Sequence, residues 1–308
     1  MTDPASELIL LLPEQRRFAG QAISPAVGKV LARADVLDAE AGEKQQLQRH
    51  FDVLPRGWPM AAMSRQSDVG DARAGTWLRA DPVHVRPDIN GVRLMAWGNL
   101  ELSMDEAVEF LQPLRPLFGD AGYLLSAPVS DRWYLMLPPE APFPAFSTPT
   151  EGLGEDLLAH LPDGAQARRW RVLLTEAQVL LHNHPRNARR MAEGRLPVNS
   201  VWFWGGGRLP DSVRTLATAA VSMDAELLAL ARMAGLASSP QQAGSTLLDL
   251  RAHRDWAVLE RGELAEALGG WKRRYGSLRL DFSDGRGYRI SHGQQWRLLR
   301  SPVQALAR

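Results

Sequence analysis

Cysteine is absent from the 308-residue chain. Disulfide bonds, zinc–thiolate sites, iron–sulfur clusters and a cysteine nucleophile are therefore excluded. Neither sign of charge dominates, because 36 lysines and arginines stand against 35 aspartates and glutamates, for a formal net charge of +1. A chain without a strong electropositive field is not expected to bind nucleic acid or a membrane surface.

Long apolar runs are missing as well. The run Leu8–Leu12 is far too short to span a bilayer or to form a signal-peptide core, and no basic segment precedes it. We therefore expect a cytoplasmic protein. Hydrophobic residues at 45% and charged residues at 23% are typical of a soluble globular protein. A chain of this length can bury one large core or two modest ones.

Strand and helix patterns alternate along the chain, which predicts an α/β fold. A buried strand is expected at residues 7–13, and the helix after it has Ser24 as its cap and Pro25 in its first turn. The polar residues 64–75 predict a loop. Further helices are expected at 43–51, 103–118, 165–184, 224–235 and 255–268. Further strands are expected at 76–80, 83–87, 91–97, 124–128, 131–138, 198–205, 245–250 and in a hairpin over 277–291 with its turn at Asp284-Gly285.

The order of these elements predicts the domain organisation. Residues 76–138 read strand, helix, strand, strand, which indicates a small α+β unit inserted in or appended to a mixed-sheet core. Ser103 and Glu106 form a capping box at its helix. Five prolines between residues 138 and 150 predict a linker at 139–150. Residues 1–75 and 151–308 are then the two parts of the α/β core.

The stretch RLPVNSVWFWGGGRLP, residues 195–210, contains an unusual glycine run. A strand that leads into Gly205–Gly207 can present backbone N–H groups to an anion. The run fits neither a Walker A loop nor a dinucleotide fingerprint. The alternative is a packed strand in which Trp202 and Trp204 fill one face and the glycines turn the chain.

Residues 184–207 resemble the archaeal-type cofactor-independent phosphoglycerate mutases, whose pattern is similar to H-P-x-N-x-x-R-x-x-x-G-x-x-P-x-N-x-x-W-x-W-G-x-G. The matching positions are His184, Pro185, Asn187, Arg190, Gly194, Pro197, Asn199, Trp202, Trp204, Gly205 and Gly207. The family has glutamine where this chain has Gly206. Over roughly residues 8–300, the layout with WLRADPVHVRPD and DRWYLML resembles a bacterial offshoot, the RpfE-type regulatory proteins.

The resemblance implies an alkaline-phosphatase-like fold with two divalent metals, manganese or zinc, and a serine that is transiently phosphorylated. Such metals activate the serine and clamp the attacking and leaving oxygens. Where the family closes its first strand with Asp-Gly, this chain has Pro13-Glu14. Where the family has a late cluster of aspartate and histidine ligands, this chain has Asp249, His253 and Asp255 in a different arrangement.

Other candidate catalytic and metal-ligating residues are few. Ser67, in SDVG, is the serine that we nominate as nucleophile, with a solvated loop serine as the alternative. Asp81, His84 and His182 are the candidate oxygen and imidazole ligands. His184 could join them, or it could cap and pack locally.

The resemblance also predicts a substrate-binding wall. Arg190 and Arg195 suit bidentate contact with phosphate, and Asn187 and Asn199 could orient such a ligand. The alternative for the arginines is a solvated helix face. The whole predicted binding set is His184, Asn187, Arg190, Arg195, Asn199, Trp204, Gly205 and Gly207.

These observations favour a degenerate phosphoglycerate-mutase-like protein, a regulatory or small-phosphate-binding module without a dimetal site and without a cofactor. Its expected partner is a small phosphorylated metabolite or another protein. The alternative is an active, metal-dependent 2,3-bisphosphoglycerate-independent mutase or phosphotransferase, which would use manganese or zinc. A third possibility is an interaction protein that uses some of its 10 tryptophans.

Overall fold

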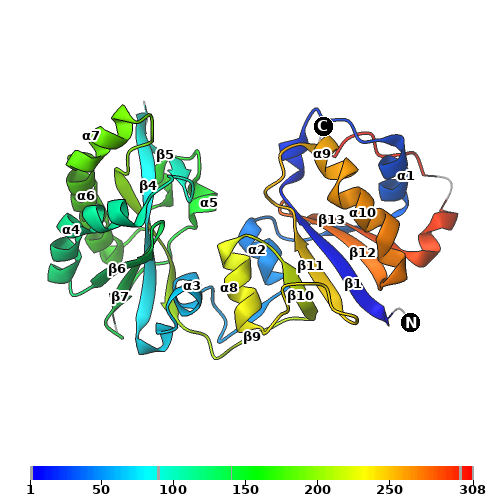
Figure 1. The fold of residues 1–308 in the computed structure, drawn as a ribbon, viewed down its shortest axis with the longest axis horizontal. Coiled ribbons are helices and arrows are strands. Elements are labelled where there is room, and N and C mark those ends of the chain that lie inside the picture. The colour runs from blue at the N-terminus through cyan, green and yellow to red at the C-terminus, as the bar shows by residue number, and fades with distance from the viewer. Residues whose placement is uncertain (1–2, 89–90, 140, 298–299, 307–308) are drawn as a thin grey trace. The chain divides into compact units, whose positions relative to one another are not determined.

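A computed structural model of the chain describes residues 3–88, 91–139, 141–297 and 300–306. The chain divides into two compact units, unit 1 with residues 1–53 and 212–308 and unit 2 with residues 54–211 (Figure 1). Strands β3 (Asp52–Leu54) and β9 (Ser212–Arg214) pair where the chain leaves unit 1 and returns to it. Within the described ranges, no helix has the length and apolar character that a membrane span needs.

Unit 1 is built on a six-stranded mixed sheet, in the order β10-β11-β1-β12-β13-β2. Its strands are β1 (Asp3–Leu12), β2 (Asp35–Asp38), β10 (Ala217–Val221), β11 (Ser245–Asp249), β12 (Tyr275–Phe282) and β13 (Arg286–Ser291). The first four in the sheet order are parallel, whereas β13 and β2 pair antiparallel. The expected mixed-sheet α/β fold is confirmed.

The core of unit 1 lies between one face of this sheet and three helices, α1 (Pro25–Arg33), α9 (Trp256–Arg261) and α10 (Glu263–Gly270). Leu10 and Leu280 from the two central strands pack there against Trp256. Helices α2 (Glu43–Gln48) and α8 (Ala225–Met233) complete the unit. Local signals are confirmed, since the Ser24 hydroxyl accepts the Val27 N–H at 3.3 Å and Gly285 turns the β12–β13 hairpin at φ 87°.

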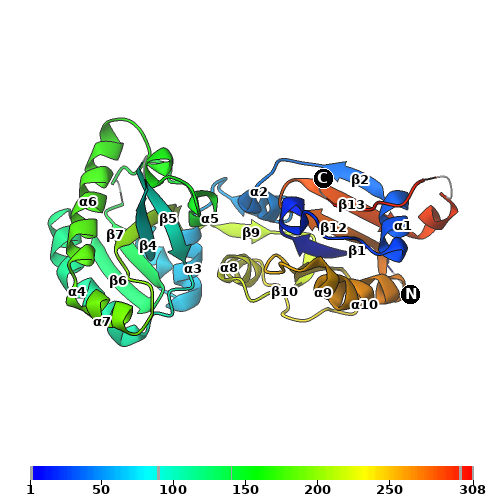
Figure 2. The same ribbon diagram turned by 90° about the horizontal axis from the view of Figure 1, so that it is seen from above.

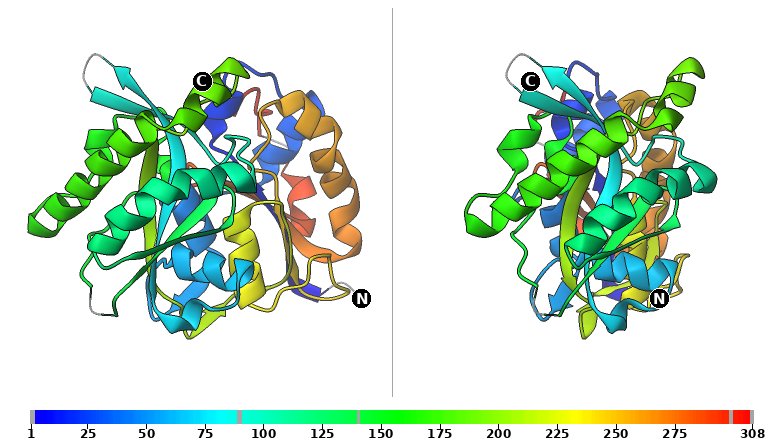
Figure 3. Two further views of the ribbon diagram at one scale, coloured as in Figure 1. Left: turned by 60° about the vertical axis from the view of Figure 1, so that its left-hand side comes forward. Right: turned by 90° about the vertical axis from the view of Figure 1, so that its left-hand side faces the viewer.

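Unit 2 is an α+β unit around the 13-residue strand β4 (Thr76–Asp88), which is cyan in Figure 3. Every pairing in its sheet is antiparallel: β7 and β8 flank the first half of β4, and β5 pairs with the second half. The other strands are β5 (Gly91–Trp97), β6 (Leu124–Val129), β7 (Arg132–Leu137) and β8 (Ser200–Arg208).

Helices cover both faces of the unit 2 sheet. Figure 2 shows α4, α6 and α7 on one face and α3 on the other. Their bounds are α3 (Met60–Asp68), α4 (Met104–Asp120), α5 (Pro149–Gly152), α6 (Ala165–His182) and α7 (Pro185–Ala192). Short 3-10 helices of unit 1 occur at Gln15–Phe18, Trp271–Arg273 and His292–Trp296. Those of unit 2 occur at Ala72–Ala74 and Leu157–His160.

The predicted loop at 64–75 was wrong at its start, because helix α3 continues to Asp68. Its polar residues have partners inside the fold. The Ser64 hydroxyl donates to the Met60 carbonyl at 2.7 Å, and the Arg65 guanidinium lies 4.5 Å from the centre of the Trp77 ring. A sequence that reads as solvated is therefore a half-buried helix.

The unit boundaries also differ from the predicted ones, which placed an α+β unit at 76–138 and a linker at 139–150. The structure extends this unit to 54–211. The described residues of the proline-rich segment pack inside it rather than joining two domains. The Phe146 ring lies 5.5 Å from that of Trp170, and the Ser147 carbonyl accepts the Trp202 indole N–H at 2.9 Å.

Candidate functional site

The glycine run lies within strand β8, at a β-bulge. Trp77 pairs with Gly207 and Arg79 with Trp204, so one residue of β4 faces two residues of β8. Gly205 supplies the left-handed conformation that the bulge needs, at φ 66°. A Cβ on Gly206 would lie 2.4 Å from the Phe143 ring. The glycine run is therefore a packed bulge, against which Phe143 and the start of α3 lie closely. This agrees with the interpretation of the run as part of a packed strand.

The two asparagines of the mutase-like motif bind main chain. The Asn187 amide donates to the carbonyls of Leu181 and Val198 at 2.7 and 2.8 Å and accepts the Val198 N–H at 2.9 Å. The Asn199 amide bonds both the N–H and the carbonyl of Val85, each at 2.8 Å. Asn187 links α7 to the end of α6 and to the segment before β8, and Asn199 links that segment to β4. Both side chains therefore have a structural role in this fold.

The two arginines of the predicted binding set converge on one carboxylate, Glu106 at the start of α4. Arg190 and Arg195 each donate from Nη1 to a Glu106 oxygen at 3.0 Å, and Arg186 donates from Nε at 3.2 Å. Arg190 and Glu106 are fully buried, whereas the Arg195 side chain is 26% exposed. The Arg186 side chain is 21% exposed, so Arg186 and Arg195 are the members of this group with surface open to a ligand.

Sequence reasoning found Glu106 only as half of a capping box, which the structure confirms through its bond to the Ser103 N–H at 3.0 Å. Burial opposes the charge of Glu106, but hydrogen bonds from that N–H and from Arg190 and Arg195 outweigh it and lower its pKa from 4.5 to about 2. Because its arginine partners lie more than 75 residues further along the chain, no local pattern could have indicated them.

Asp81 is the centre of a second buried network in unit 2. Arg79 forms a bidentate pair with its two oxygens at 2.7 and 2.8 Å. The indole N–H groups of Trp204 and Trp97 donate to Oδ2 at 2.7 and 3.1 Å, and the Trp133 backbone N–H donates to Oδ1 at 3.3 Å. All these donors surround one fully buried carboxylate, which leaves no open lone pair for a metal.

The candidate histidines have separate surroundings. His84 Nδ1 bonds the Pro197 carbonyl at 3.1 Å, and burial lowers the pKa of this imidazole. His182 is exposed at the end of α6. His184 caps α7, where its Nδ1 accepts the Arg186 N–H at 3.2 Å. Across the residues that the structure describes, no three His, Cys, Asp or Glu side chains gather as a metal site would require.

Ser67, the nominated nucleophile, lies near the end of helix α3 rather than in a loop. Its hydroxyl donates to the Met63 carbonyl at 3.3 Å. Ser64, one turn earlier, has the more polar environment, because its hydroxyl accepts from Arg79 at 3.2 Å and from Tyr134 at 3.0 Å. Ser64 is buried, whereas Ser67 is partly exposed. The serine with polar partners is therefore not the serine that a substrate could reach.

In unit 1 the parallel strands bring acidic residues to their carboxyl ends, which is where ligands bind in α/β sheets. Asp249, at the end of β11, accepts the Ser222 hydroxyl at 2.6 Å and pairs with Arg251 at 2.8 Å. Arg251 also pairs with Asp224 at 2.9 Å. Burial opposes the charge of Asp249, but the Arg251 guanidinium outweighs it and lowers the pKa of Asp249.

The remaining candidate ligands of unit 1 have partners of their own. The Glu14 carboxylate, after β1, pairs with Arg16 at 2.6 Å. His253 lies 3.5 Å from Glu263, and Asp255 caps α9 by accepting the Val258 N–H at 3.1 Å. The late residues Asp249, His253 and Asp255 therefore have three different structural roles.

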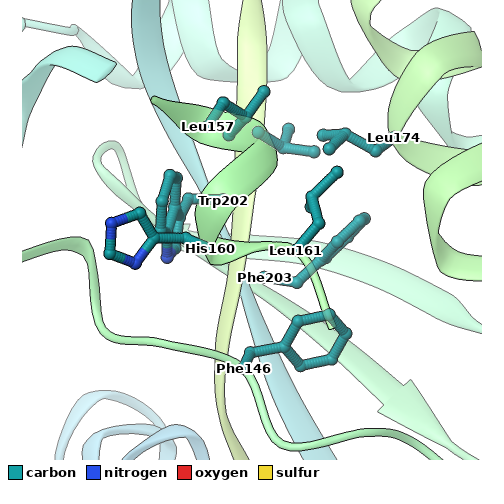
Figure 4. A pocket seen from close by; sticks show the side chains of 8 residues that line it. Phe146, Leu157, His160, Leu161, Leu174, Trp202 and Phe203 are labelled. Atoms are coloured by element: carbon teal, nitrogen blue, oxygen red, sulfur yellow. The ribbon is translucent and has the colours of Figure 1, made fainter. Parts of the chain in front are cut away.

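A crevice beside the motif strand β8 is too small for a metabolite. Its volume is about 10 Å³, which is room for about one water molecule (Figure 4). Its lining is almost entirely apolar. The residues are Phe146, Leu157, His160, Leu161, Leu174, Val201, Trp202 and Phe203.

Comparison with curated proteins gives two relatives that cover about half of the chain. A probable 2,3-bisphosphoglycerate-independent phosphoglycerate mutase of Geobacter sulfurreducens is 27% identical over 152 residues, which are 49% of this chain and 38% of the relative. The mutase of Methanosarcina barkeri is 26% identical over 174 residues, 52% of this chain and 44% of the relative. The curated relatives are phosphoglycerate mutases. The chain spans less than half of their length, and no family model matches it.

Among solved structures, the cofactor-independent phosphoglycerate mutase of Thermoplasma acidophilum is similar with a TM-score of 0.41 and 15% sequence identity. The alignment covers 94% of this chain and 90% of that one.

The donor set of the described residues does not fit the two divalent ions that the resemblance implies. Such ions need carboxylates and imidazoles with open lone pairs. Asp81 is saturated by nitrogen donors, and Asp249 is engaged by an arginine and a hydroxyl.

Proposed function

We propose that this chain is a phosphoglycerate-mutase-like protein that binds a small phosphorylated metabolite, in a regulatory role, and does not catalyse phosphoryl transfer. The similarity to phosphoglycerate mutases supports the scaffold and the class of ligand. The resemblance to the RpfE-type regulatory proteins supports the regulatory role.

The observation that carries this proposal is the environment of Asp249. Arg251 lies between Asp249 and Asp224, at 2.8 and 2.9 Å, and offsets one of their two negative charges at the sheet edge where a metal would have to bind. Although burial works against the charge of Arg251, the two carboxylates raise its pKa. Because the Arg251 guanidinium stays charged, it supplies at this sheet edge the positive charge that a metal ion would otherwise bring.

The test measures metal content and turnover on the purified full chain. We expect manganese and zinc well below one ion per chain, and no conversion of 3-phosphoglycerate to 2-phosphoglycerate when either metal is added. We also expect 3-phosphoglycerate to raise the Tm. Stoichiometric metal together with turnover that disappears in Ser67→Ala, but not in the exposed control Ser239→Ala, would overturn the proposal.

The mutase activity of the relatives favours one alternative, an active metal-dependent mutase or phosphotransferase using manganese or zinc. Its ligands would come from Asp81, His84, His182, His184, Asp249 and His253. Most of these side chains would first have to leave the partners described above, which makes metal-dependent rearrangement the signature of this alternative.

A further inference from the structure

One face of the unit 1 sheet carries charged side chains beside apolar ones. Leu280 of β12 points into the core beneath α1, α9 and α10, so strand alternation directs Arg279 and Asp281 to the opposite face. Two hollows of about 440 and 410 Å³ lie on that face. Both are lined by Glu7, Arg279 and Arg289, so the hollows meet at these three side chains.

Arg279 and Arg289, the arginine pair, are directly opposite each other on the neighbouring strands β12 and β13. Like charges in this position destabilise a sheet unless something neutralises them. Arg289 has a partner, since its Nε lies 3.2 Å from Glu7 Oε1. The buried Nε of Arg279 makes no hydrogen bond to any residue that the structure describes, and its Nη2 lies 3.6 Å from Asp281.

The neighbouring carboxylates are engaged elsewhere. Asp281 is held by Arg49 at 2.6 Å and by His50 at 2.7 Å, both from the end of α2. Asp35, the residue opposite Arg289 on β2, pairs with Arg297 at 2.6 Å. The arginine pair therefore keeps an excess of positive charge. Glu7 is the acidic residue that lines both hollows, whereas Asp38 and Asp281 line the smaller hollow alone and are held by other cations.

We propose that the arginine pair binds the phosphate group of a small phosphorylated molecule, whose organic part lies in one of the two hollows. This inference rests on the proposed function and assigns its binding site. A phosphate dianion offers acceptors that match the planar donors of two guanidinium groups. Thr215, Ser245 and Leu247 line the larger hollow, and this mixture suits a short polar ligand.

The experiment titrates the full chain with inorganic phosphate, 3-phosphoglycerate and glycerate, by calorimetry and by Tm. The variants are Arg279→Gln, Arg289→Gln and the double variant, all at exposed or half-buried sites where glutamine removes the charge and keeps a polar side chain. Arg286→Gln is the matched control. Arg286 lies on β13, like Arg289, but it pairs with Asp38 of the edge strand β2. We expect wild type to bind both phosphate-bearing probes and not glycerate.

The double variant should bind 3-phosphoglycerate at least roughly 100-fold more weakly than wild type, the loss expected for a pair of charge-assisted hydrogen bonds. Without ligand, Arg279→Gln should raise the Tm, because it removes the repulsion within the arginine pair. The control should match wild type in both measurements.

The outcomes separate this site from the proposed function. Wild-type binding that persists unchanged in the double variant would overturn the site and leave a phosphate-binding function in place. If neither phosphate-bearing probe binds wild type, both the site and the proposed phosphate-binding function are overturned. Turnover of 3-phosphoglycerate would overturn the proposed function alone, and the loss of phosphate binding in the double variant would then still support the site.

Discussion

Single buried carboxylates determine much of the stability of unit 2, and Glu106 allows the clearest test. Its pKa is about 2 in the folded chain against an ordinary 4.5. A lowered folded-state pKa stabilises the protein above the ordinary pKa, and this contribution is lost as the pH falls toward the folded value. The difference corresponds to about 3 kcal/mol, lost between roughly pH 5 and pH 2.

We therefore expect Glu106→Gln to lower the free energy of unfolding at pH 7 by about 3–5 kcal/mol, because it leaves the buried Arg190 unpaired. The variant should also lose less stability than wild type between pH 5 and pH 3, because the contribution of Glu106 is already gone. Urea unfolding at pH 7, 5 and 3 measures both effects. Glu109→Gln is the control, since Glu109 is 39% exposed and 3.6 Å from Arg186, and it should cost under about 1 kcal/mol. An equally steep acid decline in Glu106→Gln would contradict this account.

The same residues show why chemistry was harder to predict than structure. Asn187, Arg190 and Trp204 are the polar and aromatic residues that a ligand site would use, and their types and their place in the mutase-like motif predicted a binding wall. The structure gives each one an internal partner from a distant segment. Sequence spacing indicates that such residues lie together, but it does not tell whether they face a ligand or each other.

Among the structural elements, those with local signals were predicted well. The α4 capping box, the Ser24 cap and the Asp284-Gly285 hairpin each depend on residues a few positions apart. Helix α3 was missed because its polar residues find their partners in β4 and β7. The bulge in β8 was not predicted for the same reason, since it depends on Phe143 and on the start of α3.

The β8 bulge explains why this chain differs from the mutase pattern at position 206. The Phe143 ring occupies the space that a side chain there would need, because it lies 2.4 Å from the point that a Cβ on Gly206 would take. Gly206→Ala should therefore lower the free energy of unfolding by about 1–3 kcal/mol through overpacking. Gly119→Ala, near the C-terminal end of α4 with open space around it, should be neutral or stabilising by up to about 1 kcal/mol.

The glutamine of the mutase pattern extends this test to a double-mutant cycle. Gly206→Gln should be more destabilising than Gly206→Ala, and Phe143→Ala should recover a large part of that loss by vacating the space. Chemical denaturation of the four proteins in the cycle gives the coupling. Strictly additive effects would show that Phe143 does not determine the residue at this position.

At the level of complete units, the chain path predicts that unit 1 can close without its insertion. The Asp211 N–H donates to the Leu54 carbonyl at 2.8 Å, so the ends of the inserted segment are adjacent. Joining Leu54 to Asp211 through an Asn-Gly turn should give a chain with the six-stranded sheet and core of unit 1 intact. We expect a single cooperative urea transition, and phosphate-dependent stabilisation through Arg279 and Arg289. Residues 55–210 alone should retain the acid decline that Glu106 causes. A shortened unit 1 that unfolds without cooperativity, while the full chain unfolds cooperatively, would show that the insertion is needed for its core.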